Sequence, residues 1–275
     1  MIRKRSGVSH RVLALAALGA WLVLLMQAQV QAQVQVQTQV QTQAQTSPPN
    51  KTQGPLRDVV PLGGWWLDRT EVTIGQFERY VRATQTVTRA EKEGGGFEYG
   101  AGWERRRGWT WRQPDGVPAS PDLPAVHLDY AEAQAYCQWA GGRLPTGAEW
   151  QKAGFTEMRQ NPPAPWVNGR TYPWTTGDSP QGANTSDPDP WPRAAPARAT
   201  RAGVNGLYDM GANVWEWTSD ARGQERRTVG GSWWYGAFNM KADVQAYKPA
   251  DFFAVYIGFR CAYDRAPTGA GASSS

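Results

Sequence analysis

Tryptophan is the residue that most limits how this chain can fold. The 275 residues include 15 tryptophans, of which 14 lie beyond residue 32, and a folded chain must cover most of the surface of such large apolar rings. The 30 glycines and 20 prolines favour many turns, yet their share stays below that of a disordered chain. Residues 55–264 are long enough for one domain with a sizeable core. We therefore expect a loop-rich domain with an aromatic core.

The N-terminal 32 residues have the pattern of a signal peptide. Four basic residues precede the apolar run 12–26, which is short for a membrane span, and small residues suited to cleavage follow at 30–32 or 26–28. The protein would then be exported to the periplasm or the extracellular space. An uncleaved N-terminus is the alternative, and it would tether the protein to a membrane.

Removal of residues 1–32 changes the charge of the chain. Of the 29 basic residues, four would leave with the signal peptide, so 25 would remain against 24 acidic residues. A nearly neutral domain lacks the clustered positive charge that binds phosphate backbones, so we expect no nucleic-acid partner. Alternating glutamines in residues 33–54 predict a flexible linker, and residues 265–275 predict a disordered tail.

Capping boxes predict three helices, because an N-cap side chain and a Gln or Glu three residues on can satisfy each other's backbone N–H groups. The N-caps are Thr73, Asp129 and Thr146, with Gln76, Glu132 and Glu149 as partners. The second helix should end at Gly141 and Gly142. Residues 255–261 alternate in a way that predicts a strand whose buried face carries Cys261. Helices followed by strands and turns favour the α+β class.

Cys137 and Cys261 are the two cysteines of the chain. In an exported protein, an even number of cysteines favours a disulfide. The bond would join the second predicted helix to the C-terminal strand. In the entropy model, closing a loop of this length contributes about 4–5 kcal/mol to stability.

Six segments, in order and at similar spacing, resemble the formylglycine-generating enzyme or sulfatase-modifying-factor family. They are WWLDRTEVTIGQFERYV (65–81), LPAVHLDYAEAQAYCQWAGGRLPTGAEWQKA (123–153), YPWTTGDSPQGANTSD (172–187), NGLYDMGANVWEWTSD (205–220), VGGSWWYGA (229–237) and IGFRCA (257–262). Together they cover nearly all of residues 55–264. The resemblance implies a C-type-lectin-like α+β domain, heavy in loops, with structural calcium and with the two cysteines in a structural disulfide.

Residues 208–217, YDMGANVWEW, carry oxygen atoms suited to calcium. Ca²⁺ takes six to eight oxygen ligands from side chains and carbonyls, and this stretch offers Asp209, Asn213 and Glu216. The alternative is that Asp209 and Asn213 are turn residues and that Glu216 belongs to a buried ion pair.

The resemblance assigns calcium ligands in two places. In the first site, the ligands would be the side chains of Asp209 and Glu216 and the carbonyls of Ala212 and Val214. A second site would match Asn184 and Thr185, with Asp187 or Asp189 as a further candidate ligand. Calcium is therefore the cofactor that we expect.

Residues 230–240, GGSWWYGAFNM, resemble the active-site segment of the family enzymes. These enzymes oxidise a sulfatase cysteine to formylglycine with O₂, using two cysteines that bind copper(I), and Cu(I) requires soft thiolates. Tyr235 and Met240 stand at the two cysteine positions, so we do not expect copper. Ser232 matches a family serine and is interpreted as a hydrogen-bonding group. His127 is the one histidine beyond the signal peptide, too few for a histidine-rich iron site, and we expect it to be structural.

Aromatic residues with few charges follow this segment and predict a binding surface. The candidates are Trp233, Trp234, Tyr235, Phe238, Asn239, Met240, Asp243, Tyr247, Phe252, Phe253 and Tyr256. The alternative is that about half of them fill the core, above all Trp233 and Phe253.

Three functions remain open. The first is an exported, non-catalytic module that binds an unidentified protein or small ligand, and the loss of both copper cysteines favours it. The second is a divergent oxidase of the same family that acts on a sulfatase cysteine. The third is a variable binding protein diversified by a retroelement, because such proteins use this fold and end in a similar GGSW … IGFR segment.

Overall fold

The computed structural model describes residue 31 and residues 57–267, and residues 57–267 belong to one compact unit. The linker predicted at 33–54 lies outside the described residues, as do almost all of the signal peptide predicted at 1–32 and most of the tail predicted at 265–275. None of the helices that the structure describes is both long and apolar enough to cross a membrane.

The largest sheet has four strands in the order β7-β6-β5-β8. Its central strand β5 (Trp215–Arg222) pairs antiparallel with β6 (Glu225–Val229) and parallel with β8 (Ile257–Gly258). Strand β7 (Ala246–Pro249) pairs antiparallel with β6. Because β5 begins at Trp215, the segment 208–217, which is predicted to bind calcium, runs directly into β5.

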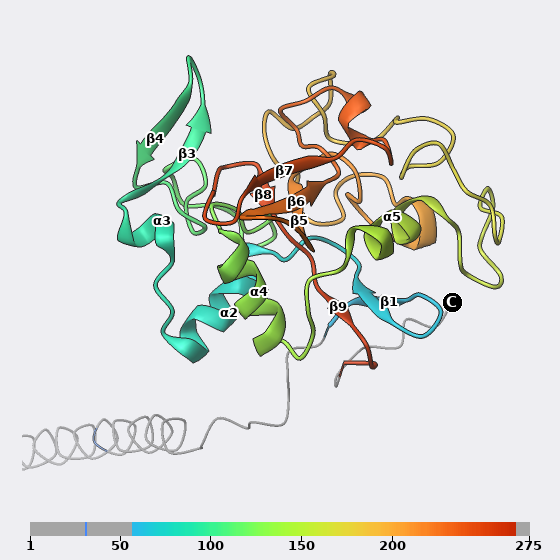
Figure 1. Cartoon of the computed structure of the whole chain (residues 1–275), viewed down its shortest axis with the longest axis horizontal. Helices are drawn as coiled ribbons and strands as arrows, with labels where there is room; N and C mark the ends of the chain where they lie inside the picture. Colours follow the sequence, from blue (N-terminus) through green and yellow to red (C-terminus); the bar gives the residue numbers. More distant parts are fainter. Residues whose placement is uncertain (1–30, 32–56, 268–275) are drawn as a thin grey trace, which may run out of the picture. The chain divides into compact units, whose positions relative to one another are not determined.

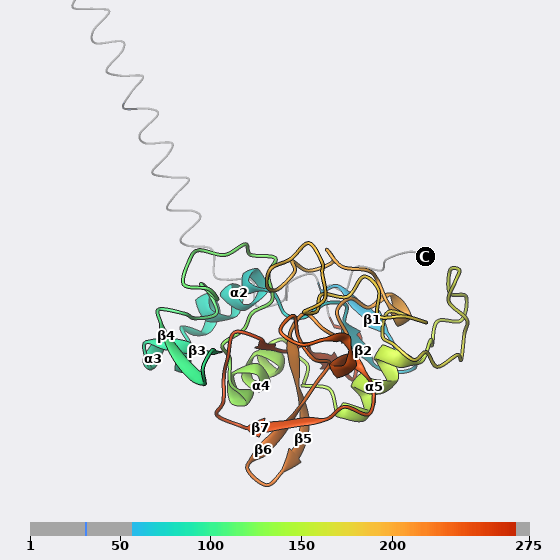
Figure 2. The same cartoon turned by 90° about the horizontal axis from the view of Figure 1, so that it is seen from above.

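A second sheet joins the two ends of the domain. It has the order β1-β2-β9, with β1 (Val59–Pro61), β2 (Trp66–Asp68) and β9 (Ala262–Tyr263). A separate hairpin consists of β3 (Gly95–Tyr99) and β4 (Trp103–Arg107). Figures 1 and 2 show this hairpin next to α3 (Arg89–Lys92) on one side of the domain, with α5 (Gly147–Phe155) on the opposite side.

All three predicted helices are confirmed with their capping boxes. They are α2 (Ile74–Thr84) after Thr73, α4 (Tyr130–Trp139) after Asp129 and α5 after Thr146. The end of α4 is also as predicted, since Gly141 follows it with a φ of +80° that favours glycine. A fourth capping box, between Thr88 and Glu91, starts the short α3 and was not predicted. Two 3₁₀ turns, η1 (Val204–Gly206) and η2 (Ala237–Met240), lie within the loops.

The main core is aromatic, as expected. The ring of Phe77 in α2 lies 5.0 Å from Trp111 and 5.7 Å from Tyr136 of α4. Tyr136 in turn packs 5.3 Å from Phe259, and all four rings are buried. A smaller core places Trp150 of α5 with residues of β1, β2 and β6. The two helices α2 and α4 are thus fixed to the C-terminal segment by ring contacts.

The C-terminal segment 255–261 differs from its prediction. Residues 253–263 are all buried, and the strands within this stretch, β8 and β9, belong to different sheets. The predicted outer face is wrong because Arg260, which should lie on it, forms an ion pair with Glu216 inside the domain. The predicted disulfide is confirmed, and it joins Cys137 of α4 to Cys261 just before β9.

We predict that replacing both cysteines, Cys137→Ser with Cys261→Ser, lowers the free energy of unfolding by about 3–5 kcal/mol. The bond spans 124 residues, so its loss restores a large conformational entropy to the unfolded chain. Urea denaturation of the variant and of the oxidised protein would measure the difference, with the reduced protein as control. Equal unfolding midpoints for all three samples would contradict the prediction.

Candidate functional site

A buried ion pair lies where β5 meets the C-terminal segment. Arg260 Nε lies 2.9 and 2.8 Å from the two carboxylate oxygens of Glu216, and Arg260 Nη2 lies 2.7 Å from Oε1. Neither side chain is more than 1% exposed. Trp150 Nε1 donates a further hydrogen bond to Glu216, and Arg260 also donates to the carbonyls of residues 68, 69 and 208. Glu216 is therefore a member of a buried ion pair, as one of the two interpretations predicts.

Two further carboxylates make this region more negative than one arginine can balance. Asp209 and Glu71 are both buried. Thr200 donates to Asp209 Oδ1 at 2.7 Å, but within the described chain Asp209 Oδ2 has no hydrogen-bond partner. Burial, with a contribution from Glu216, raises the pKa of Asp209 to about 7, and burial together with Asp209 raises the pKa of Glu71 well above its usual range. An added cation would relieve this repulsion.

The loop that carries Asp209 has a constrained backbone. Asp209, Ala212 and Asn213 have φ angles of 54°, 72° and 53°, a region that residues other than glycine rarely adopt. At Gly211 a side chain would not fit, because a Cβ atom would lie 2.8 Å from Thr175 Oγ1. Such conformations persist where surrounding contacts enforce them, and they are common at ligand sites.

Asn184 and Thr185 lie in a second loop that contacts the first. Asn184 Nδ2 donates to a backbone carbonyl and to Asn213 Oδ1, whereas Asn184 Oδ1 is buried without a partner in the described residues. The Thr185 N–H donates to Asp189 at 3.0 Å, and its hydroxyl donates to Asp187 at 3.4 Å. The predicted residues of the second calcium site are thus close together. No three His, Cys, Asp or Glu side chains of the described chain gather as a metal site, so either loop would need amide and carbonyl oxygens as ligands.

Asn213 connects both loops to the active-site-like segment 230–240. Its N–H donates to the carbonyl of Asn184 at 2.9 Å, its side chain donates to Glu71 at 3.0 Å, and its carbonyl accepts from the N–H of Trp233 at 2.9 Å. Two more backbone hydrogen bonds join this segment to the loops, from Ala212 to Gly230 at 2.7 Å and from Ser186 to Tyr235 at 3.0 Å. The conformation of residues 230–235 therefore depends on both loops.

Tyr256 is the centre of a group of aromatic side chains that is partly open to solvent. The ring centroids of Trp103, Trp234 and Tyr235 lie 5.8, 6.3 and 6.4 Å from the Tyr256 ring. Trp103 also packs 4.6 Å from Phe252 and 5.3 Å from Tyr99. These six residues are named the aromatic cluster here: Tyr99, Trp103, Trp234, Tyr235, Phe252 and Tyr256. Tyr99, Trp103 and Trp234 are exposed by 44%, 46% and 40%, so a ligand can reach them.

Two members of the aromatic cluster were missed by sequence reasoning. Tyr99 and Trp103 are paired opposite each other across the β3–β4 hairpin, far in sequence from the other members. The hairpin itself carries a usable signal, because two aromatic residues that flank a glycine-rich turn tend to pair across the strands. What the sequence does not give is the contact of this hairpin with Phe252 and Tyr256.

Four residues of the predicted binding surface are buried. Trp233, Met240, Phe253 and Tyr256 are at most 8% exposed. Met240 packs in a small core with Ala183 and Ala212, and the other three are covered by neighbouring rings. Trp233 and Phe253 thus fill the core, as the alternative interpretation predicts. The remaining candidates are half-buried or exposed, and their binding role stays a prediction: Trp234, Tyr235, Phe238, Asn239, Asp243, Tyr247 and Phe252.

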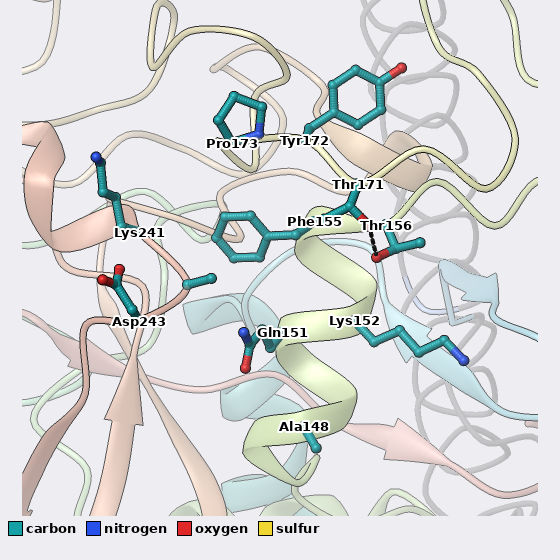
Figure 3. A pocket seen from close by; sticks show the side chains of 11 residues that line it. Ala148, Gln151, Lys152, Phe155, Thr156, Thr171, Tyr172, Pro173, Lys241 and Asp243 are labelled. Atoms are coloured by element: carbon teal, nitrogen blue, oxygen red, sulfur yellow. Dashed lines mark hydrogen bonds between the residues drawn. The ribbon is translucent and has the colours of Figure 1, made fainter.

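The structure also divides the predicted surface into separate places. Asp243 lines a groove of about 510 Å³ beside α5, and Figure 3 shows Asp243 and Lys241 on one side of it, with Gln151 and Phe155 on the other. Tyr247 lies on β7, with Arg222 stacked 4.2 Å from its ring. A different groove of about 410 Å³ is lined by Trp233, Trp234 and several residues of the stretch 185–192. This second groove and the aromatic cluster share Trp234, and together they form the candidate ligand site.

The active-site-like segment holds no thiolate. Both cysteines of the chain form the disulfide, so neither can supply the thiolate that Tyr235 and Met240 lack. Ser232 is buried and accepts a 3.4 Å hydrogen bond from the N–H of Trp234, which suits a structural role. His127 is also buried; its Nε2 lies 3.0 Å from the carbonyl of Pro114, and burial lowers its pKa to about 4. A neutral, enclosed imidazole of this kind suits the structural role predicted for His127, which stays a prediction.

Short helices, small sheets and long connecting loops define a loop-rich α+β domain of the C-type-lectin-like class. The solved structure of "Treponema denticola variable protein 1" has a TM-score of 0.52 with this chain at 17% identity, covering 75% of this chain and 86% of that one. At this identity the likeness concerns the fold. The predicted fold class is confirmed.

Residues 25–265 match the family model described as "Sulfatase-modifying factor enzyme 1-like domain", and the chain belongs to this family. "Formylglycine-generating enzyme" from Bos taurus is 31% identical, and the match covers 78% of this chain and 70% of that protein. "Inactive C-alpha-formylglycine-generating enzyme 2" from Mus musculus is also 31% identical, and the match covers 76% of this chain and 78% of that protein. The predicted family is confirmed, and its related members include an enzyme and a protein named as inactive.

We predict that Arg260→Met lowers the free energy of unfolding by about 3–5 kcal/mol, because it leaves Glu216 charged and unpaired in the interior. The double variant Glu216→Gln with Arg260→Met should recover part of this loss. Urea denaturation followed by circular dichroism would compare them. Arg82→Met is the control, since Arg82 pairs with Glu78 at the surface and its loss should change stability little. An effect of Arg260→Met as small as that of the control would refute the prediction.

Proposed function

We propose that this protein is an exported, calcium-stabilised binding module that does not form formylglycine. The observation that carries the proposal is the state of its cysteines, because the chain has two and both are joined in the disulfide. Copper(I) is held by soft thiolates, and Tyr235 and Met240 at the family's copper positions supply none. The likeness to a relative whose name describes it as inactive is a further support.

The two loops offer what a calcium ion needs. Asp209 Oδ2 and Asn184 Oδ1 are buried oxygen atoms without a hydrogen-bond partner in the described chain, and Ca²⁺ is bound by such oxygens. In this proposal the first ion is held by Asp209 and the carbonyls of Ala212 and Val214, next to Glu216, whose carboxylate stays paired with Arg260. The second ion is held by Asn184 and Thr185. Bound calcium would offset the charge of the buried carboxylates. Through Asn213 it would also fix the segment that carries Trp234 and Tyr235.

The aromatic cluster and the adjoining groove are the surface that supports binding best. Rigid aromatic side chains lose little conformational entropy when a ligand covers them, and they anchor many interfaces. Trp234 belongs to the cluster and also lines the groove. A protein segment or a small molecule could therefore contact both at once.

Export is supported by the disulfide, because cytosolic thiols are kept reduced. The signal-peptide pattern of residues 1–32 points the same way, and cleavage would release the protein to the periplasm or extracellular space. An uncleaved N-terminus would hold the same domain at a membrane.

The two alternative functions have weaker support. A divergent oxidase would need copper or iron ligands other than thiolates. A variable protein diversified by a retroelement rests on the fold alone, and a near-identical template repeat beside the coding region would be the decisive observation for it.

The first test concerns catalysis. With Cu(I) and a cysteine-containing sulfatase peptide, we expect neither oxygen uptake nor formylglycine detectable by mass spectrometry, because no thiolate pair is present to bind the copper. The variant Tyr235→Cys with Met240→Cys serves as the matched control, and it should gain Cu(I) affinity if these are the family positions. Turnover by the unaltered protein would overturn the proposal.

The second test concerns calcium. Saturating Ca²⁺ at about 100 times its Kd stabilises a protein by about 2.7 kcal/mol, so removal with EDTA should lower the Tm by roughly 5–10 °C for a domain of this size. Asp209→Ala should reduce this response, whereas Asp178→Ala, which removes an exposed carboxylate paired with Arg170, should preserve it. A Tm that does not respond to EDTA or Ca²⁺ would exclude stabilisation by calcium.

A further inference from the structure

Lys248 is a half-buried lysine that contacts Trp215, a direct neighbour of the aromatic cluster. It lies on β7, and its ammonium is 5.2 Å from the ring centroid of Trp215. Over the described residues, Lys248 forms no ion pair with an acidic side chain. Burial is the cause that lowers its pKa. Because a buried charge without a counter-ion is unfavourable, this position calls for an explanation.

Beside Lys248, the indole N–H of Trp215 is a second polar group whose partner is missing from the described residues. The side chain is 3% exposed, and its Nε1–H is buried without an acceptor in the part of the chain that the structure describes. Buried polar groups are nearly always hydrogen-bonded, so an orphaned donor is a sign of a missing partner. The Trp215 ring lies edge-on to Tyr235 of the aromatic cluster, at 5.8 Å. One indole therefore contacts both the lysine and the cluster.

The charges around Lys248 favour an anion as that partner. The residue paired with Lys248 on β6 is Arg226, whose guanidinium stacks on Tyr130 at 4.9 Å. Two cationic side chains thus occupy opposite positions on neighbouring strands, and Lys248 gains no compensation from its own sheet partner. A ligand carboxylate next to Lys248 would supply the absent negative charge and accept hydrogen bonds from N–H donors.

We propose that Lys248 and Trp215 form an anion-binding subsite of the aromatic cluster, and that the ligand carries a carboxylate attached to a flat apolar group. The flat group would stack on the exposed rings, and the carboxylate would lie at Lys248. This inference rests on the proposed binding function and deepens it by naming the ligand class. The carboxylate could belong to a small aromatic acid or to the C-terminus of a peptide that ends in an aromatic residue.

The test compares two probes that differ in charge but not in shape. Isothermal titration calorimetry of the full-length, calcium-loaded protein would measure binding of 2-naphthylacetate and of its neutral amide. The acid should bind about tenfold more tightly or better, because a charge-assisted contact is worth at least that factor. A short peptide ending in Trp, with a free or an amidated C-terminus, repeats the comparison and shows which source of carboxylate is preferred.

Variants of Lys248 test whether this residue causes the preference for the acid over the amide. Lys248→Met should remove the preference for the acid, and Lys248→Arg should keep it. Lys241→Met is the matched control, because Lys241 has the same 5.2 Å contact with an indole, that of Trp174, and lies outside the cluster. Unchanged melting temperatures would show that the variants fold.

Equal binding of acid and amide by the unaltered protein would overturn the inference, as would a preference that survives in Lys248→Met. Failure of all probes to bind would also overturn it. Failure of the proposed function would look different, since it would appear as copper-dependent oxygen uptake.

Discussion

The buried pair of Glu216 and Arg260 is the interaction on which the rest of the structure depends. Glu216 stands near the start of β5, and Arg260 stands between β8 and β9. Through its other N–H groups the guanidinium reaches carbonyls at the end of β2 and in the loop before Asp209. One charged side chain thus holds the large sheet, the terminal sheet and the calcium-type loop together. Enclosure of this pair also explains why the segment from 253 to 263 has no solvent face.

The local features of the fold were predictable from sequence, and the reason is that their causes are local. Each capping box at Thr73, Asp129 and Thr146 joins groups three residues apart, so the sequence contains both partners. The strand predicted at 255–261 failed for the opposite reason. Alternation indicates an outer face only if nothing covers it, and the partner that covers this segment at Arg260 is Glu216, 44 residues away.

In the candidate site, too, the features that depend on neighbouring residues were predictable, and the contacts between distant residues were not. The resemblance located the two loops and the segment with Tyr235 and Met240, because these are runs of consecutive residues. It could not show which aromatic rings remain exposed. Trp233 and Trp234 are neighbours in sequence, yet one is buried and the other is exposed. Trp103 contacts Phe252 and Tyr256 in the segment between β7 and β8, and Lys248 of β7 contacts Trp215 of β5. No pattern near Trp103 or Lys248 in the sequence indicates these contacts.

The β3–β4 hairpin has a consequence for how the ligand range of such a protein could change. It supplies Tyr99 and Trp103 to the cluster, and the middle of its strand β3 is attached to the domain through a bridge between Phe97 and Ala254. The ion pair, the disulfide and both loops that contain Asp209 and Asn184 lie in other segments. Substitutions at the hairpin tip would therefore alter one wall of the cluster without disturbing what stabilises the domain. This separation lets recognition evolve, or be engineered, while the scaffold stays the same.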